Sequence, residues 1–251
     1  MRRYILAGNW KMYKDQNETT ALIQELLPLV QNNTDVDIVV GPTFTSLAAA
    51  MQATKGTPIA VSAQDCYWEE EGAFTGEVSV PMLKAVGVKY CIIGHSERRQ
   101  YFGETDATIN KKAKALYKHG IIPIICCGEL LEVRKAGNTN QVVETQLRGC
   151  LADLPADKVR ETVIAYEPVW AIGTGEVATP EQAQEVHAMI RGLLTELYGA
   201  DVAQAVRIQY GGSVKPDNVK ELMSKPDIDG ALVGGAALKA ASFASIVNFQ
   251  K

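Results

Sequence analysis

The sequence predicts an α/β protein of the (β/α)8 barrel class, in which eight parallel strands are surrounded by helices. Short apolar runs alternate with amphipathic segments along the 251 residues. Most runs are apolar throughout, as in "DIVV" and "IIPIICC", which is typical of parallel strands buried on both faces. Eight strand–helix units in about 250 residues fit a closed barrel, so we expect a single domain over residues 1–251.

Each predicted strand is a run of four to six residues. The runs are Tyr4–Asn9, Val36–Gly41, Ile59–Ala63, Lys89–Gly94, Ile121–Cys126, Thr162–Glu167, Arg207–Tyr210 and Gly230–Val233. The alternative architecture is an open, doubly wound sheet. Such a sheet usually carries a glycine-rich dinucleotide turn after its first strand, whereas this chain has Asn9-Trp10-Lys11 there.

The helices lie between these runs, and their ends are marked to different degrees. The clearest start is at Thr179, which can cap the first turn with Gln182 as its capping-box partner, while Pro180 suits that turn. A second helix is expected over Thr105–His119. The first, over Thr19–Val30, should end or kink at its internal proline.

Composition excludes several classes of function. The hydrophobic fraction of 47% and the charged fraction of 22% are ordinary for a globular protein. The net charge of −4 predicts neither a nucleic-acid nor a membrane partner, and no apolar run has the ~18 residues of a membrane span. The N-terminus lacks the apolar core of a signal peptide. Five cysteines without C-x-x-C spacing indicate reduced thiols, so we expect a cytoplasmic protein.

Chemically capable side chains follow three of the predicted strands. Asn9 ends the first strand and Lys11 comes just after it, His95 and Glu97 follow the fourth strand, and Glu167 ends the sixth. Taken alone, each has a plainer interpretation as a solvated or hydrogen-bonded structural residue. In a barrel, however, the carboxyl ends of all strands meet at one mouth, where active sites lie. Their convergence therefore predicts a catalytic site.

No metal site or serine nucleophile is predicted. The three histidines are scattered without H-x-x-x-H spacing, and no G-x-S-x-G occurs. We expect His119 to be solvated at a helix end and His187 to lie on a helix surface.

Glycine pairs follow the last two strands, as Gly211-Gly212 before Ser213 and as Gly234-Gly235. Backbone N–H groups approach an anion closely where no Cβ intervenes, and turns at these positions of a barrel commonly hold phosphate. A glutamate base, a histidine donor and a lysine around a phosphate fit proton abstraction beside a carbonyl.

Five motifs occur in order along the chain: "GNWKM" at 8–12, "IIGHSERR" at 92–99, "AYEPVWAIGTG" at 165–175, "YGGSV" at 210–214 and "LVGGA" at 232–236. Together they resemble the triosephosphate isomerase family of TIM barrels. The resemblance implies cofactor-independent interconversion of D-glyceraldehyde 3-phosphate and dihydroxyacetone phosphate through an enediolate.

The resemblance also implies residue roles. Glu167 would be the base and His95 the electrophile, a neutral imidazole whose pKa is lowered by a helix N-terminus, as is described for this family. Lys11 and Asn9 would contact the substrate, and Glu97 would lie beside Lys11. The residues implied to bind the phosphate are Gly173, Ser213, Gly234 and Gly235.

The loop 168–178 would be a lid that excludes water from the reactive intermediate. Its apolar residues 169–172 would provide the cover. The chain departs from the family pattern at its far hinge, Glu176-Val177-Ala178, and also at Tyr13, Cys127 and Asp65. The hinge departure could alter how the lid opens, and Asp65 puts one local interface contact in doubt.

The segment 64–77 has no clear periodicity and reads as a long loop. Trp68 and Phe74 argue against disorder. The resemblance implies that this loop docks into a second subunit, with Thr75 reaching the partner's site near Lys11. We therefore expect a homodimer, the alternative being a self-packed surface loop.

Two other functions fit the same barrel. One is a Schiff-base aldolase or lyase that uses Lys11, although a lysine beside Glu97 should stay protonated. The other is a catalytically silent barrel that binds a phosphorylated metabolite.

Overall fold

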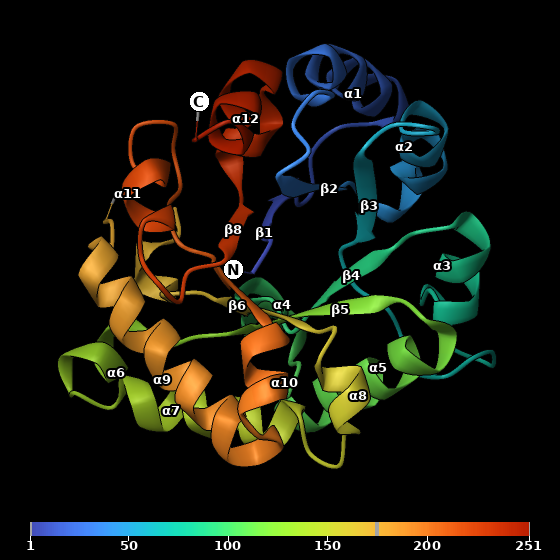
Figure 1. The fold of residues 1–251 in the computed structure, drawn as a ribbon. Coiled ribbons are helices and arrows are strands. Elements are labelled where there is room, and N and C mark those ends of the chain that lie inside the picture. The colour runs from blue at the N-terminus through green and yellow to red at the C-terminus, as the bar shows by residue number, and fades with distance from the viewer. Residues whose placement is uncertain (1, 174–175, 251) are drawn as a thin grey trace.

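The computed structural model describes residues 2–173 and 176–250 and forms a closed parallel barrel (Figure 1). Neighbouring strands pair in chain order, and β8 returns to β1, with Ile5 opposite Gly230. The strands are β1 (Tyr4–Asn9), β2 (Val36–Gly41), β3 (Ile59–Ala63), β4 (Tyr90–Ile93), β5 (Ile122–Cys127), β6 (Val163–Tyr166), β7 (Arg207–Tyr210) and β8 (Gly230–Val233). The predicted barrel is confirmed, and the open-sheet alternative is wrong because β1 and β8 pair.

Helices surround the barrel in Figure 1. They are α1 (Gln16–Val30), α2 (Leu47–Ala53), α3 (Val80–Val86), α4 (Ser96–Phe102), α5 (Asp106–His119), α6 (Leu131–Lys135), α7 (Thr139–Cys150), α8 (Ala156–Val159), α9 (Pro180–Tyr198), α10 (Ala200–Ala205), α11 (Val219–Met223) and α12 (Ala240–Val247). Short 3-10 turns occur at Phe44–Ser46, Val169–Ala171 and Gly235–Leu238.

Two of the helix predictions are confirmed, and one is corrected. Thr179 caps α9 in a capping box with Gln182, and Thr105 caps α5. Helix α1 continues through Pro28 to Val30 instead of ending there. Near the end of a helix, a proline removes only one late hydrogen bond, and Gln31 N–H, three residues further on, still bonds to Leu27 O.

The apolar strands bury two separate layers. One layer fills the barrel interior and includes Ile5, Val39, Ile92, Ile124 and Leu232. The larger layer packs between the strands and the helices. Because successive side chains of a strand point to opposite sides, both faces of each strand must be apolar. This explains why the sequence shows continuous apolar runs.

Every cysteine in the described residues is a free thiol, and all of them are buried. Within the described ranges, no helix is both long and apolar enough for a membrane span. The segment between β3 and α3 contains no helix, and Tyr67 stacks on Trp68 with ring centroids 4.1 Å apart. It is therefore an ordered loop whose tip, residues 71–77, is exposed.

Candidate active site

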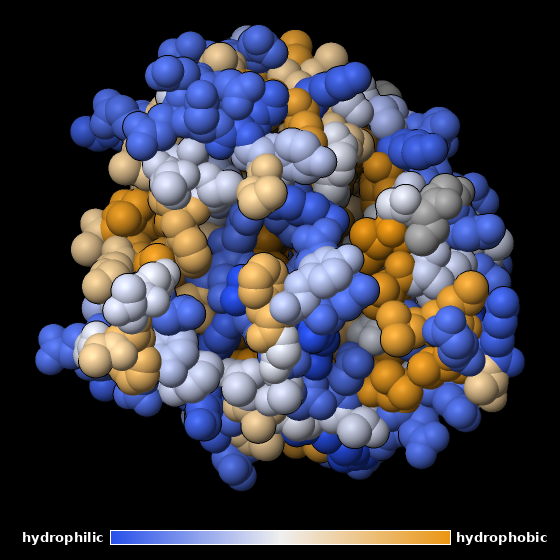
Figure 2. All heavy atoms as spheres, turned by 180° about the vertical axis from the view of Figure 1, so that it is seen from behind, coloured by the Kyte–Doolittle hydropathy of each residue, from blue (hydrophilic) through white to orange (hydrophobic). Residues whose placement is uncertain are grey.

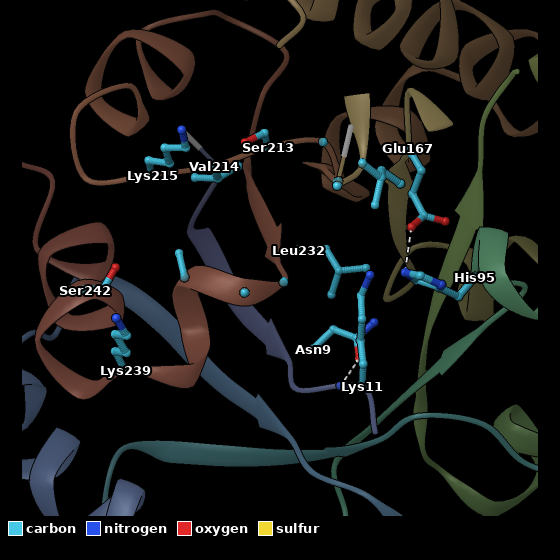
Figure 3. A pocket seen from close by; sticks show the side chains of 17 residues that line it. Asn9, Lys11, His95, Glu167, Ser213, Val214, Lys215, Leu232, Lys239 and Ser242 are labelled. Atoms are coloured by element: carbon cyan, nitrogen blue, oxygen red, sulfur yellow. Dashed lines mark hydrogen bonds and ion pairs between the residues drawn. The ribbon is translucent and has the colours of Figure 1, made fainter. Parts of the chain in front are cut away.

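The strand-end residues meet at one cavity in the mouth of the barrel. Figure 2 shows this face, hollowed near its centre and surrounded by hydrophilic residues. The cavity has a volume of about 460 Å³. Its lining includes the predicted residues Asn9, Lys11, His95, Glu167, Gly173, Ser213, Gly234 and Gly235 (Figure 3). The predicted site residues therefore converge, although they come from six different parts of the chain.

Lys11 is held by contacts to both its main chain and its side chain. Its backbone has φ 53°, an uncommon value for a residue other than glycine. Asn9 Oδ1 accepts from Lys11 N–H at 3.1 Å, and Gln64 Nε2 donates to Lys11 O at 2.8 Å. The ammonium contacts Glu97 Oε1 at 2.6 Å. Glu97 thus lies beside Lys11 as predicted, and the paired ammonium is oriented toward the mouth.

His95 is the N-cap residue of α4, and both of its ring nitrogens have partners. Nδ1 accepts from Glu97 N–H at 3.2 Å, and Nε2 lies 2.8 Å from Glu167 Oε1. A nitrogen that accepts carries no proton, so the geometry assigns the neutral tautomer with the proton on Nε2. His95 can therefore donate a hydrogen bond from Nε2 into the cavity.

The expected lowering of the His95 pKa is not observed. Burial acts to lower this pKa, but the charge of Glu167, its hydrogen bond and the charge of Glu97 together raise it above the ordinary value. The physical reason is the 2.8 Å contact with a carboxylate, which favours the protonated ring. The expectation considered only the helix N-terminus. The backbone N–H at Nδ1 determines only that a neutral ring carries its proton on Nε2.

Glu167 is almost fully buried, at 1% exposure, and is fixed at both oxygens. Oε2 accepts from Ser96 N–H at 2.9 Å, while Oε1 contacts His95. The opposite side of the carboxylate arm is bounded by Gly211, where a Cβ would lie 2.8 Å from Glu167 Cγ. The first glycine after β7 is therefore required by close approach to Glu167.

The glycine-rich turns form the other side of the cavity. Gly234 lies against the lysine, since a Cβ there would be 3.7 Å from Lys11 Cε. A Cβ at Gly235 would meet no atom within 4 Å, so its backbone is open to the cavity. Gly173 has φ 69°, which glycine adopts readily. These turns expose backbone around a space that a phosphate group could fill.

The predicted lid begins with the 3-10 turn Val169–Ala171. Trp170 Nε1 donates to the buried Glu129 Oε1 at 3.0 Å, and the Tyr166 hydroxyl reaches the same oxygen at 3.1 Å. Of the four apolar residues 169–172 predicted to cover the site, only Ile172 lines the cavity. The rest of the predicted lid, 168–178, includes residues 174 and 175, which lie outside the described residues.

Sequence reasoning missed several residues of this site. Gln64 comes directly after β3, and Ser96 comes directly after His95, just past the end of β4. Reading the residues just past each strand could therefore have found both. Leu232, on β8, and the lysines Lys215 and Lys239 also line the cavity, but nothing in their spacing marks them.

The other two histidines have structural contacts. His119 Nε2 lies 3.0 Å from Glu70 Oε1, so it has a side-chain partner instead of being simply solvated. The prediction that His187 lies on the surface is wrong. It is buried because its ring packs edge-on against Tyr166 of β6, and its Nδ1 lies 3.2 Å from Asp227 O.

Fold and site together define an α/β-barrel protein with a carboxylate, an imidazole and an ammonium group around a glycine-lined cavity. The sequence model of the family described as "Triosephosphate isomerase" matches residues 4–250. The triosephosphate isomerase of Citrifermentans bemidjiense is 59% identical over 251 residues, covering 100% of both chains. Those of Trichlorobacter lovleyi and Moorella thermoacetica are 58% and 57% identical, again over 100% of both chains. The chain belongs to the triosephosphate isomerase family.

Proposed function

We propose that this chain interconverts D-glyceraldehyde 3-phosphate and dihydroxyacetone phosphate without a cofactor, as part of glycolysis and gluconeogenesis. The observation that supports this most directly is the 2.8 Å approach of Glu167 and His95 in a cavity that also contains Lys11 and the two glycine turns. An acid–base pair beside an anion site is what an isomerisation of a phosphorylated carbonyl compound needs.

Glu167 acts as the base. When the triose phosphate enters, its carbonyl oxygen replaces the carboxylate as acceptor for His95 Nε2–H, and Glu167 turns to the adjacent carbon. The carboxylate removes a proton from C1 of dihydroxyacetone phosphate, and the electron pair moves to the C2 oxygen as an enediolate. His95 Nε2–H gives its proton to the C2 oxygen, and Nε2 then takes the hydroxyl proton from the C1 oxygen. Glu167 returns its own proton to C2 as the C1 oxygen becomes the aldehyde carbonyl, so both residues end as they began and the reaction consumes no other reactant.

The cationic and hydrogen-bond-donating residues stabilise the charge that develops on oxygen. His95 donates to the enediolate from Nε2, and Lys11 compensates its negative charge. Asn9 orients Lys11 through its N–H group. Gly173, Ser213, Gly234 and Gly235 bind the phosphate, and the loop 168–178 closes over it to exclude water.

A direct assay tests this proposal against its two alternatives. Dihydroxyacetone phosphate is added to the pure protein, and formation of the aldehyde is followed by proton NMR. We expect conversion to equilibrium without any added metal or nucleotide. A borohydride-trapped covalent adduct on Lys11 would instead indicate a Schiff-base enzyme, and saturable binding without turnover would indicate a silent binding barrel.

We propose that the chain forms a homodimer through the loop 64–77. Large apolar and aromatic side chains are exposed after each of the strands β1 to β4, which is typical of an interaction surface. They are Met12, Tyr13, Phe44, Phe74, Met82, Tyr101 and Phe102. Thr75 lies in the exposed tip of the loop, while Gln64 at the loop's base holds Lys11. Sedimentation of Thr75→Arg tests this: we expect monomers with reduced activity, whereas a fully active wild-type monomer would contradict it.

We further propose a cytoplasmic location and one domain over residues 1–251. The buried free thiols support a reducing compartment. Pairing of β1 with β8 supports one folding unit, because the barrel closes only when both ends of the chain are present.

A further inference from the structure

The mouth cavity continues beyond the residues that the proposed reaction uses. Its far end is lined by Lys215, Lys239 and Ser242 (Figure 3). In that view, Leu232 lies between these residues and Glu167, and Leu232 comes just before the turn with Gly234 and Gly235 in the chain. A phosphate in the glycine turns would therefore have the reacting carbons on one side and the two lysines on the other.

The two lysines differ from Lys11 in their pairing. Lys11 has a carboxylate partner at 2.6 Å. Among residues 2–173 and 176–250, neither Lys215 nor Lys239 forms a salt bridge, and both are exposed. Lys239 also borders a neighbouring groove with Glu18, but the two are not paired. Both ammonium groups thus have all three donors available for an anion.

The backbone that carries Lys215 is fixed relative to the phosphate turn. Lys215 N–H donates to Asn218 Oδ1 at 2.8 Å, and Asn218 Nδ2 donates to Ser213 O at 3.0 Å. The side-chain amide of Asn218 thereby ties Lys215 to the residue predicted to contact phosphate. Lys239 is placed at the start of α12, three residues before Ser242. Both lysines are therefore presented from defined backbone at the far end of the cavity.

We propose that Lys215, Lys239 and Ser242 form a second anion subsite, which takes the outer phosphate of small molecules with two linked or closely spaced phosphate groups. One phosphate of such a molecule occupies the glycine turns, and the other contacts the ammonium groups. A triose phosphate has only one phosphate and leaves this subsite unused. Compounds with two phosphate groups occupy the same glycine turns as the substrate and therefore bind in competition with it.

The proposal rests on the proposed function only in that the glycine turns bind a phosphate. It is tested with inorganic phosphate and pyrophosphate as probes, whose dissociation constants are measured by titration calorimetry on the full chain. The quantity compared is the dissociation constant of phosphate divided by that of pyrophosphate, which is large when pyrophosphate binds more tightly. We expect pyrophosphate to bind more tightly, and the double variant Lys215→Gln/Lys239→Gln to lower the ratio about tenfold, since two exposed ion pairs are lost.

The matched control is Lys220→Gln, an exposed lysine on α11 outside the cavity lining. It removes one lysine charge without touching the subsite, so the ratio should not change. A ratio unchanged in the double variant, or lowered as much in the control, would overturn the subsite alone. Failure of inorganic phosphate to bind the wild-type chain would instead overturn the subsite together with the proposed phosphate turns.

Discussion

Two neighbouring charged residues of helix α4 belong to two different clusters. Both clusters combine cations with carboxylates, but they differ in how many partners each cation has. Glu97 joins the mouth cluster, which we define as Lys11, Glu97, His95 and Glu167. Arg98 joins the support cluster, defined as Asp65, Arg98, Glu104 and Lys112. The Lys11 side chain is 25% exposed, whereas that of Lys112 is 4% exposed.

In the support cluster, each cation contacts two carboxylates. Lys112 contacts Asp65 at 2.6 Å and also contacts Glu104. Arg98 bridges the same two carboxylates at 2.9 Å and 2.6 Å. Lys11, by contrast, has one carboxylate partner and borders the cavity. The comparison teaches that donors left available at a cavity, and not the presence of charge, distinguish the candidate site from a structural ion cluster.

The largest effect is expected from Lys11→Ala. It removes the cation beside the proposed enediolate and leaves Glu97 without its partner, so kcat/KM should fall about 10³–10⁴-fold through both KM and kcat. Steady-state kinetics with Lys84→Ala, an exposed lysine on α3, as control measures this. If the Lys11 variant kept both constants, Lys11 would have no role in the reaction.

In the support cluster, Lys112→Met should lower the stability of the fold and not the turnover of a folded protein. Two buried carboxylates would then share only Arg98, so the free energy of unfolding should drop by about 3–5 kcal/mol. Urea denaturation measures the drop, with Lys114→Met on the exposed side of α5 as control. A folded Lys112 variant with normal stability but no turnover would mean that the support cluster takes part in catalysis, which would contradict the distinction between the two clusters.

Glu167→Asp tests the position of the base without changing its charge. Shortening the side chain by one methylene moves the carboxylate from the carbon it must deprotonate, so kcat should fall about 10²–10³-fold with little change in KM. Glu185→Asp on the exposed face of α9 is the matched control. Equal kinetics for both variants would contradict the assignment of the base.

The smallest effect concerns the pH dependence of Asp65. Burial raises the pKa of this carboxyl to about 6, against the opposing charge of Lys112. Because the folded pKa exceeds the unfolded value of 3.8, Asp65 binds its proton more tightly in the folded chain. Its contribution to stability is therefore full below about pH 4 and is lost as the pH rises through 6.

The free energy of unfolding of the wild type, minus that of Asp65→Asn, should accordingly fall between pH 4.5 and pH 7.5 (roughly the titration window) by on the order of 2 kcal/mol. Urea titrations at the two pH values measure this difference. Asp217→Asn, at an exposed aspartate, should show no such trend. A difference that grows toward pH 7.5 would mean that Lys112 outweighs burial.

Much of this molecule could be predicted from the sequence because the pattern and the chemistry are local. Apolar runs placed the strands within about one residue, and the strand-end rule brought Lys11, His95 and Glu167 to one mouth. The position of His187 could not be predicted, since a polar residue on α9 gives no sign that its face is covered. The His95 pKa depends on which way Glu167 points, and spacing does not encode that rotamer.

The central claim is that Glu167 carries a proton between adjacent carbons of the substrate. Dihydroxyacetone phosphate is incubated in deuterium oxide with the wild type or with Glu167→Gln, and the loss of the C1 proton signal is followed by NMR. We predict that the wild type exchanges one of the two C1 protons, and that the variant exchanges it at the rate without protein. Exchange by the variant at the wild-type rate would contradict the account.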